Sequence, residues 1–194
     1  MKRVLLAVAL AATLLLAGAD APAQQPGWQS LMRAEDRAAL DAWRASVDGN
    51  VAKIAPADYY GIRPDELRRL LALRPGTLDP RALPGRWRCR NVQISQSGVF
   101  GYPPFACAIR QTPQGLFFEK TAGSQRLSGM LYPDDGTRLV LLGGATVNQE
   151  PQRSYAGGNE NDVVGALFAV SRNQLMLIFT GRYGTQFYEM TPAR

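Results

Sequence analysis

The spacing of apolar residues changes from a helical to a strand-like period about 80 residues into the chain. Five apolar residues recur at three- or four-residue multiples before that point: Trp28, Leu31, Leu40, Trp43 and Val47. This spacing predicts an amphipathic helix over residues 30–47. Shorter helical segments are predicted over residues 51–54 and 64–71, the second with proline in its first turn. We expect these two or three short helices to pack on the rest of the protein. A helical arm that captures a partner is the alternative.

From Leu83 onward, short runs rich in β-branched and aromatic residues are separated by turn residues. Eight strands are predicted, over residues 86–95, 105–111, 116–121, 126–132, 138–147, 163–171, 174–180 and 186–191. Turn sequences such as Asp134-Asp135-Gly136 and Arg172-Asn173 favour antiparallel, up-and-down connections. The fold class is therefore all-β, a small barrel or sandwich, and a barrel is favoured because closure removes unpaired edges. Residues 149–162 are expected to form a long surface loop.

The first residues follow a third pattern. Lys2 and Arg3 precede an apolar run over residues 4–17, and Ala/Gly/Pro-rich sequence follows. This order predicts a signal peptide over residues 1–23, because the run is shorter than the roughly 20 residues of a membrane-spanning helix. Cleavage after Ala23 is preferred to cleavage after Ala19, and an uncleaved anchor is the alternative. No cysteine directly follows the apolar run, so we expect a periplasmic protein that is not a lipoprotein. The rest of the chain is expected to form a helical segment over 24–82 and a barrel over 83–194.

The composition of the chain argues against several kinds of catalysis, metal site and partner. The chain has no histidine, two cysteines and a formal net charge of +6, which falls by one when the leader is removed. Because imidazole is the usual general base and metal ligand, its absence excludes Ser-His-Asp and Cys-His catalysis and argues against zinc. Basic residues are spread along the chain without a long run, so no nucleic-acid partner is expected. We expect a monomer that is not an enzyme and uses no cofactor or metal.

The two cysteines, Cys89 and Cys107, fall in the first two predicted strands. In an oxidising compartment they are expected to form a disulfide. A loop of this length contributes about 3 kcal/mol to stability in the chain-entropy model. A redox-active pair is the alternative, but it would favour the close Cys-x-x-Cys spacing that is missing here.

The most polar connection between predicted strands spans residues 119–126. An ordinary hairpin is the favoured interpretation of this connection. It could instead present a binding rim at the barrel mouth, made of Lys120, Ser124, Gln125 and Arg126. A serine–lysine nucleophile is the third alternative, if burial lowers the lysine pKa. The oxygen-rich residues 157–162 offer possible Ca²⁺ ligands, but they lack the EF-hand order, and a solvated loop is the favoured interpretation. Tyr59-Tyr60 is the aromatic pair expected to be exposed.

Several sequence motifs of this chain resemble those of known protein families. They read G-R-W-R-C-R at 85–90, Y-P-P-F-A-C-A-I at 102–109, E-K-T-A-G-S-Q-R at 119–126 and G-M-L-Y-P-D at 129–134. With them, the chain from Trp28 onward resembles an exported proteobacterial family of unknown function. The Gly85-x-Trp87 opening also resembles the calycin-like barrels, including periplasmic metalloprotease inhibitors. That second resemblance implies an eight-stranded antiparallel barrel whose Trp87 plugs one end, and a disulfide near the first strand. In those inhibitors an N-terminal segment enters the protease cleft, whereas here the predicted helices intervene.

Three functional hypotheses follow. The first is a non-enzymatic binding module that holds an envelope protein, as a protease inhibitor would, or a small apolar or glycan ligand at the barrel mouth. The second is an envelope structural or assembly factor that docks through its N-terminal helices. The third is a hydrolase that depends on carboxylates or lysine. A barrel interior filled by side chains would argue against a ligand carrier, and an exposed apolar helix face would favour docking.

Overall fold

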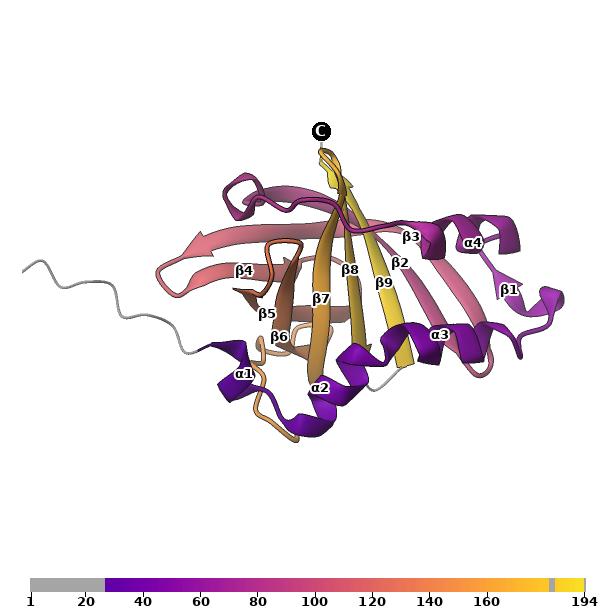
Figure 1. The fold of residues 1–194 in the computed structure, drawn as a ribbon, viewed down its shortest axis with the longest axis horizontal. Coiled ribbons are helices and arrows are strands. Elements are labelled where there is room, and N and C mark those ends of the chain that lie inside the picture. The colour runs from indigo at the N-terminus through magenta and orange to yellow at the C-terminus, as the bar shows by residue number, and fades with distance from the viewer. Residues whose placement is uncertain (1–26, 182–183, 194) are drawn as a thin grey trace, which may run out of the picture.

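The computed structural model describes residues 27–181 and 184–193, so the predicted leader and the start of the mature chain lie outside the described residues. Eight strands form a closed antiparallel barrel (Figure 1). They are β2 (Gly85–Ser95), β3 (Gly98–Thr112), β4 (Gly115–Lys120), β5 (Gln125–Pro133), β6 (Arg138–Val147), β7 (Asp162–Ser171), β8 (Gln174–Gly181) and β9 (Gly184–Pro192). Each strand pairs with the next one along the chain, and β9 pairs with β2 to close the ring. The all-β, up-and-down barrel with N-terminal helices is therefore confirmed.

Strand β3 is the one that departs most from its predicted bounds. It begins at Gly98 rather than at residue 105 and continues through Pro103 and Pro104. A shift in its pairing with β2, between Arg90 and Val92, accommodates an additional residue on β3. The prolines have no N–H to donate, and this part of β3 extends beyond the segment that pairs with β4. This part of β3 therefore extends past β4, while β2 remains paired with β9 as far as Ile94.

The helical segment is more broken than its periodicity predicts. Three helices replace the single one expected over residues 30–47: α1 (Trp28–Leu31), α2 (Ala34–Asp41) and α3 (Trp43–Val51). The first break falls at Met32, whose extended backbone accompanies a buried side chain. Helix α4 (Pro64–Ala72) begins at a proline, as predicted. Two 3₁₀ turns complete the segment, η1 (Pro56–Asp58) and η2 (Pro80–Ala82), with the short strand β1 (Tyr59–Tyr60), which pairs in parallel with β3.

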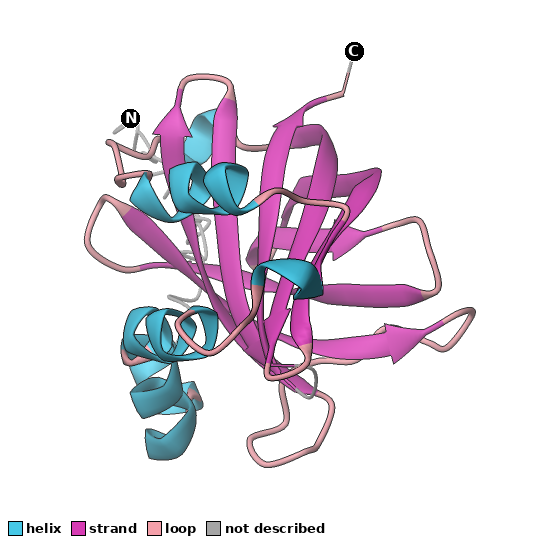
Figure 2. Ribbon diagram, turned by 90° about the vertical axis from the view of Figure 1, so that its right-hand side faces the viewer, coloured by secondary structure: helices cyan, strands magenta, loops and turns pink. Residues whose placement is uncertain are grey.

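Apolar side chains fill the barrel and also cover part of its outside. The interior cluster includes Trp87, Ile109, Phe118, Leu141, Leu177 and Tyr188. On the outer wall, Val47 of α3 and Leu67 of α4 pack with Val92 and Phe187, while Trp28 and Leu40 pack with β6 and β7. The helices thus lie against the outside of the barrel (Figure 2), and their apolar side chains are buried there. No helix in the described part of the chain is long and apolar enough to cross a membrane.

Candidate functional site at the barrel mouth

Trp87 lies inside the barrel, near the end at which β2 begins. This side chain, on the first barrel strand, is 7% exposed and lies in the interior cluster. Its indole N–H donates a hydrogen bond of 3.0 Å to the carbonyl oxygen of Leu83, which satisfies the polar edge of a buried ring. Leu78 and Leu83 belong to the same cluster. We call the opposite end of the barrel, where β4 ends and β5 begins, the mouth.

The mouth carries the polar connection between β4 and β5. Lys120 is the last residue of β4 and Gln125 the first of β5, so the four residues expected at the rim lie together at this end. A cavity of about 50 Å³ opens here. Its lining is Gln125, Arg126, Leu127, Ala145, Thr146, Val147, Asn161, Val163, Phe179, Gln186 and Tyr188. The cavity is small because the side chains of the interior cluster fill most of the barrel.

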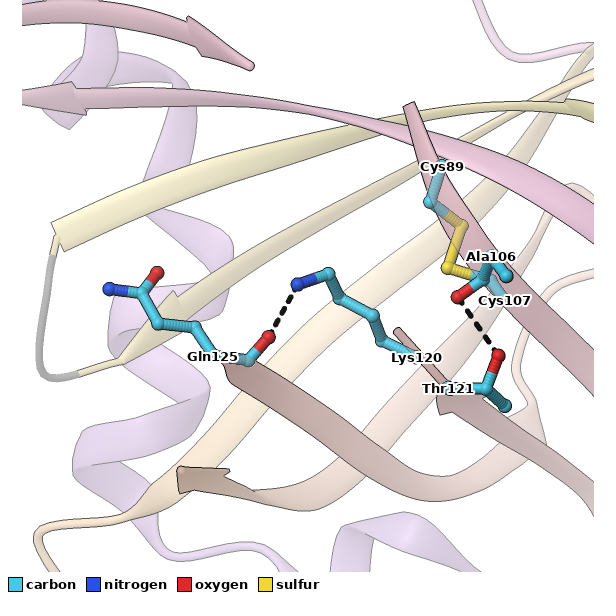
Figure 3. The surroundings of a disulfide bond; sticks show 6 residues. All are labelled: Cys89, Ala106, Cys107, Lys120, Thr121 and Gln125. Atoms are coloured by element: carbon cyan, nitrogen blue, oxygen red, sulfur yellow. Dashed lines mark hydrogen bonds between the residues drawn. A yellow bond between two sulfur atoms is a disulfide. The ribbon is translucent and has the colours of Figure 1, made fainter. Parts of the chain in front are cut away.

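Lys120 differs from its expected place on an exposed rim, because only 6% of the residue is accessible to solvent. Its ammonium donates a hydrogen bond to the backbone oxygen of Gln125 (Figure 3) and lies 4.2 Å from the centre of the Phe105 ring. Gly123 sits against both groups with φ +86°, and a Cβ at this position would come within 2.9 Å of the Lys120 Nζ. A glycine is therefore needed in the turn that covers the lysine.

The surroundings of Lys120 favour its neutral form. Burial, and to a lesser extent the positive charge of Arg126, lower the pKa of Lys120 from 10.5 to about 8. The other three expected rim residues lie nearer to solvent. Ser124 and Gln125 are exposed, and half-buried Arg126 donates to the carbonyl oxygen of Gly123 at 3.2 Å. Because Lys120 turns its ammonium to the backbone of Gln125 and not to the Ser124 hydroxyl, the arrangement does not assemble the serine–lysine nucleophile.

A buried amide pair near the mouth was not foreseen. Asn91 donates from its side-chain amide to the side-chain oxygen of Gln186 at 2.9 Å, and both residues are buried. The Oδ1 of Asn91 has no hydrogen-bond partner among the described residues. The signal was present in the sequence, since Asn91 follows Trp87 and Cys89 at every second position and so faces inward with them.

The predicted disulfide is confirmed. Cys89 on β2 and Cys107 on β3 are bonded, buried, and have Cα atoms 6.0 Å apart. Cys107 also lies directly opposite Lys120 in the pairing of β3 with β4 (Figure 3). The crosslink therefore joins β2 to β3 beside the lysine.

The loop considered as a Ca²⁺ site is held together by hydrogen bonds to the carboxylate of Asp162. The carboxylate of Asp162 accepts hydrogen bonds of 2.8–2.9 Å from the backbone N–H groups of Ala156, Gly158 and Asn159. Its oxygens thus hold the loop closed. Among the described residues, no three His, Cys, Asp or Glu side chains gather in a way that would hold a metal ion. Of the aromatic pair, Tyr60 is exposed and stacks on Phe100, with ring centres 5.1 Å apart, whereas Tyr59 is half-buried.

Comparison with known proteins identifies a family for this chain but no curated relative. No curated protein matches the chain. The model of a family described as "Domain of unknown function (DUF4893)" matches residues 28–187, which includes the helices and nearly all of the barrel. The proteobacterial origin and the kinship with calycin-like barrels stay predictions. The chain belongs to the DUF4893 family of domains of unknown function.

Proposed function

We propose that this protein is an exported, non-enzymatic binding module of the periplasm that recognises a protein partner at the barrel mouth. The observation that carries this proposal is the filled interior. A buried water needs about 10–15 Å³ of such space, so the mouth cavity of about 50 Å³ has room for roughly four waters. That space fits the tip of one side chain, and a whole glycan or apolar ligand is too large for it.

The chemistry at the mouth favours a partner group that accepts hydrogen bonds. Arg126 and the side-chain amides of Gln125 and Gln186 line the cavity, and each provides N–H donors. Apolar walls from Phe179 and Tyr188 surround them. A carboxylate or carboxamide side chain from a partner can therefore be bound by donors at the rim while its stem packs on the walls. This is the pattern of an anchor residue surrounded by polar contacts.

Two features support the exported location. The pattern of residues 1–23 is that of a signal peptide. The Cys89–Cys107 disulfide is of the kind that persists in oxidising compartments and is rare in the cytosol.

Docking through the N-terminal helices remains the second hypothesis, but the helices do not favour it. Their apolar side chains, among them Trp28, Leu40, Val47 and Leu67, are buried against the barrel. In helices α1 to α4, Leu31 is the exposed large apolar residue. An interface built on these helices would lack the exposed apolar patch that docking surfaces usually offer.

Native mass spectrometry on the mature protein, purified gently from the periplasm, tests the proposal. We expect a second polypeptide to co-purify with the wild type and to be lost from Arg126→Glu, which reverses the charge at the mouth. Arg172→Glu makes the same change in the exposed turn between β7 and β8, at the end of the barrel opposite the mouth, and should keep the partner. A bare monomer, or equal loss of the partner in both variants, would refute recognition of a protein at the mouth.

A further inference from the structure

A second concave surface lies on the outer wall of the barrel, away from the mouth. Residues 148–161, which join β6 to β7 and which we call the strap, fold back over this wall (Figure 1). The strap passes so close to β6 that a Cβ on Gly144 would lie 2.7 Å from the Cβ of Arg153. Glycine at this position therefore allows the strap to lie directly on the sheet.

Side-chain hydrogen bonds tie the strap to the barrel and to the helices. On one side, Gln152 donates to the carboxylate of Glu119 on β4 at 2.8 Å, and Arg110 donates to the same carboxylate at 2.9 Å. On the other side, the Tyr155 hydroxyl donates to the carboxylate of Asp36 on α2 and accepts the backbone N–H of Arg33 at 3.0 Å. The strap is thus fixed to both the barrel and the helices, and the space beside it is preformed.

That space, which we call the outer groove, has a volume of about 380 Å³. The strap lines it with Arg153, Ser154, Tyr155 and Ala156, and the opposite wall is formed by Leu31, Phe117, Gly129, Met130, Tyr132 and Leu142. Its volume falls within the range of small-molecule sites, which are mostly apolar with a few polar groups. It is several times larger than the cavity at the mouth.

The walls of the outer groove are apolar and partly uncovered. Leu31 is 39% exposed, and Phe117, Met130 and Tyr132 are half-buried. Burial raises the pKa of the Tyr132 phenol, as an apolar surrounding should. Met130 is flexible and polarizable, so it adapts to ligands of different shape. An apolar molecule placed here would cover surface that water now contacts.

The charge at the outer groove has one sign. Among the described residues that line it, only Arg153 is charged. Its guanidinium is 3.7 Å from the Glu150 carboxylate, and both side chains are nearly half exposed. Such an exposed pair is weak, so Arg153 is able to exchange this partner for an anionic group of a ligand.

We propose that the outer groove binds a small amphipathic organic anion, with its apolar body against Phe117, Met130 and Tyr132 and its anionic group at Arg153. This site is separate from the mouth, and it does not depend on the function proposed there.

Calorimetric titration of the mature protein with octanoate tests this inference, with octanol as the uncharged probe. We expect saturable binding of octanoate, and about tenfold or greater weakening in Arg153→Gln. Octanol should bind more weakly than octanoate and should not distinguish Arg153→Gln from the wild type. Absence of saturable octanoate binding up to about 1 mM, a limit that corresponds to a very weak site, would overturn the proposal. Equal octanoate affinity in Arg153→Gln and the wild type would also do so.

A second pair of variants places the ligand. Met130→Trp fills the outer groove at a half-buried position, and Val147→Trp makes a similar change at an exposed apolar residue of the mouth. Circular dichroism confirms that both variants are folded before titration. We expect Met130→Trp to abolish octanoate binding and Val147→Trp to retain it. Retention in the first variant, or loss in the second alone, would place the ligand elsewhere and overturn the assignment to the outer groove.

Discussion

The side chains of Asn91 and Gln186 form a buried hydrogen bond of 2.9 Å between β2 and β9, the two strands whose pairing closes the barrel. Neither amide can exchange this partner freely with water. The Oδ1 of Asn91 already has no partner among the described residues. This pair therefore combines a favourable contact with the cost of burying polar atoms, and the balance is measurable.

A double-mutant cycle on this pair should be strongly non-additive. Asn91→Leu leaves the Gln186 amide buried without its partner, so we expect a loss of about 1–3 kcal/mol in the free energy of unfolding. Gln186→Leu should cost a similar amount for the same reason. The double variant should cost less than the sum, because it removes both polar groups. Urea unfolding of the four proteins gives the coupling energy, and additive losses would show that the hydrogen bond contributes little.

Lys120 should make stability depend on pH above neutrality. Burial lowers the pKa of Lys120 to about 8 in the folded protein, so between about pH 8 and pH 10.5 the unfolded chain binds more protons at this residue than the folded one. The free energy of unfolding should therefore rise with pH in this window. Denaturant unfolding of the wild type should show this rise relative to Lys120→Met, which lacks the titrating group. Parallel pH profiles for the two proteins would contradict the lowered pKa.

The Cys89–Cys107 disulfide should be a source of stability. It spans a sequence separation of 18 residues, so its removal should cost about 3 kcal/mol through the greater freedom of the unfolded chain. The Cys89→Ala/Cys107→Ala variant avoids new buried hydroxyls, and guanidinium unfolding compares it with the oxidised wild type. Adding a reductant should lower the stability of the wild type and leave the variant unchanged. An effect of the reductant on the variant would show that it acts by another route.

Glu119 should limit how fast a protease cleaves the strap. Its buried carboxylate accepts hydrogen bonds from Arg110 and Gln152, so Glu119→Ala removes the contact of Gln152 that ties the strap to β4. We expect faster cleavage within residues 148–161 in limited proteolysis, because cleavage requires local opening. Glu150→Ala removes a more exposed carboxylate whose ion pair with Arg153 is weak, and should change cleavage less. Equal cleavage of the two variants would show that Glu119 does not fix the strap.

The strands were predictable because local chemistry and the final fold agree. Between β5 and β6, for example, the carboxylate of Asp135 accepts the backbone N–H of Thr137 at 2.9 Å, and Gly136 has a positive φ of 80°, which is what the turn sequence predicts. The helices were less predictable. The spacing of Trp28, Leu31 and Leu40 is compatible with one continuous helix, but contacts with the barrel wall decide where that helix breaks.

The candidate sites depend on contacts between distant residues, so the sequence could indicate them only in part. The residues of the β4–β5 connection do meet at the mouth, but the burial of Lys120 depends on Phe105 from another strand. The outer groove exists because Tyr155 reaches Asp36, 119 residues away. Local periodicity contains no information about such a pair.

The pairing of β2 with β9 also shapes how the chain reaches its fold. Partners such as Val92 and Phe187 are roughly 95 residues apart, and such non-local pairing slows folding. The intervening strands can pair in order through short turns, but the ring closes only when its two most distant members meet. Before that moment the chain carries two unpaired edges of one sheet, each able to accept a strand. Strand exchange between two unclosed molecules is therefore the misfolding route that this topology makes available.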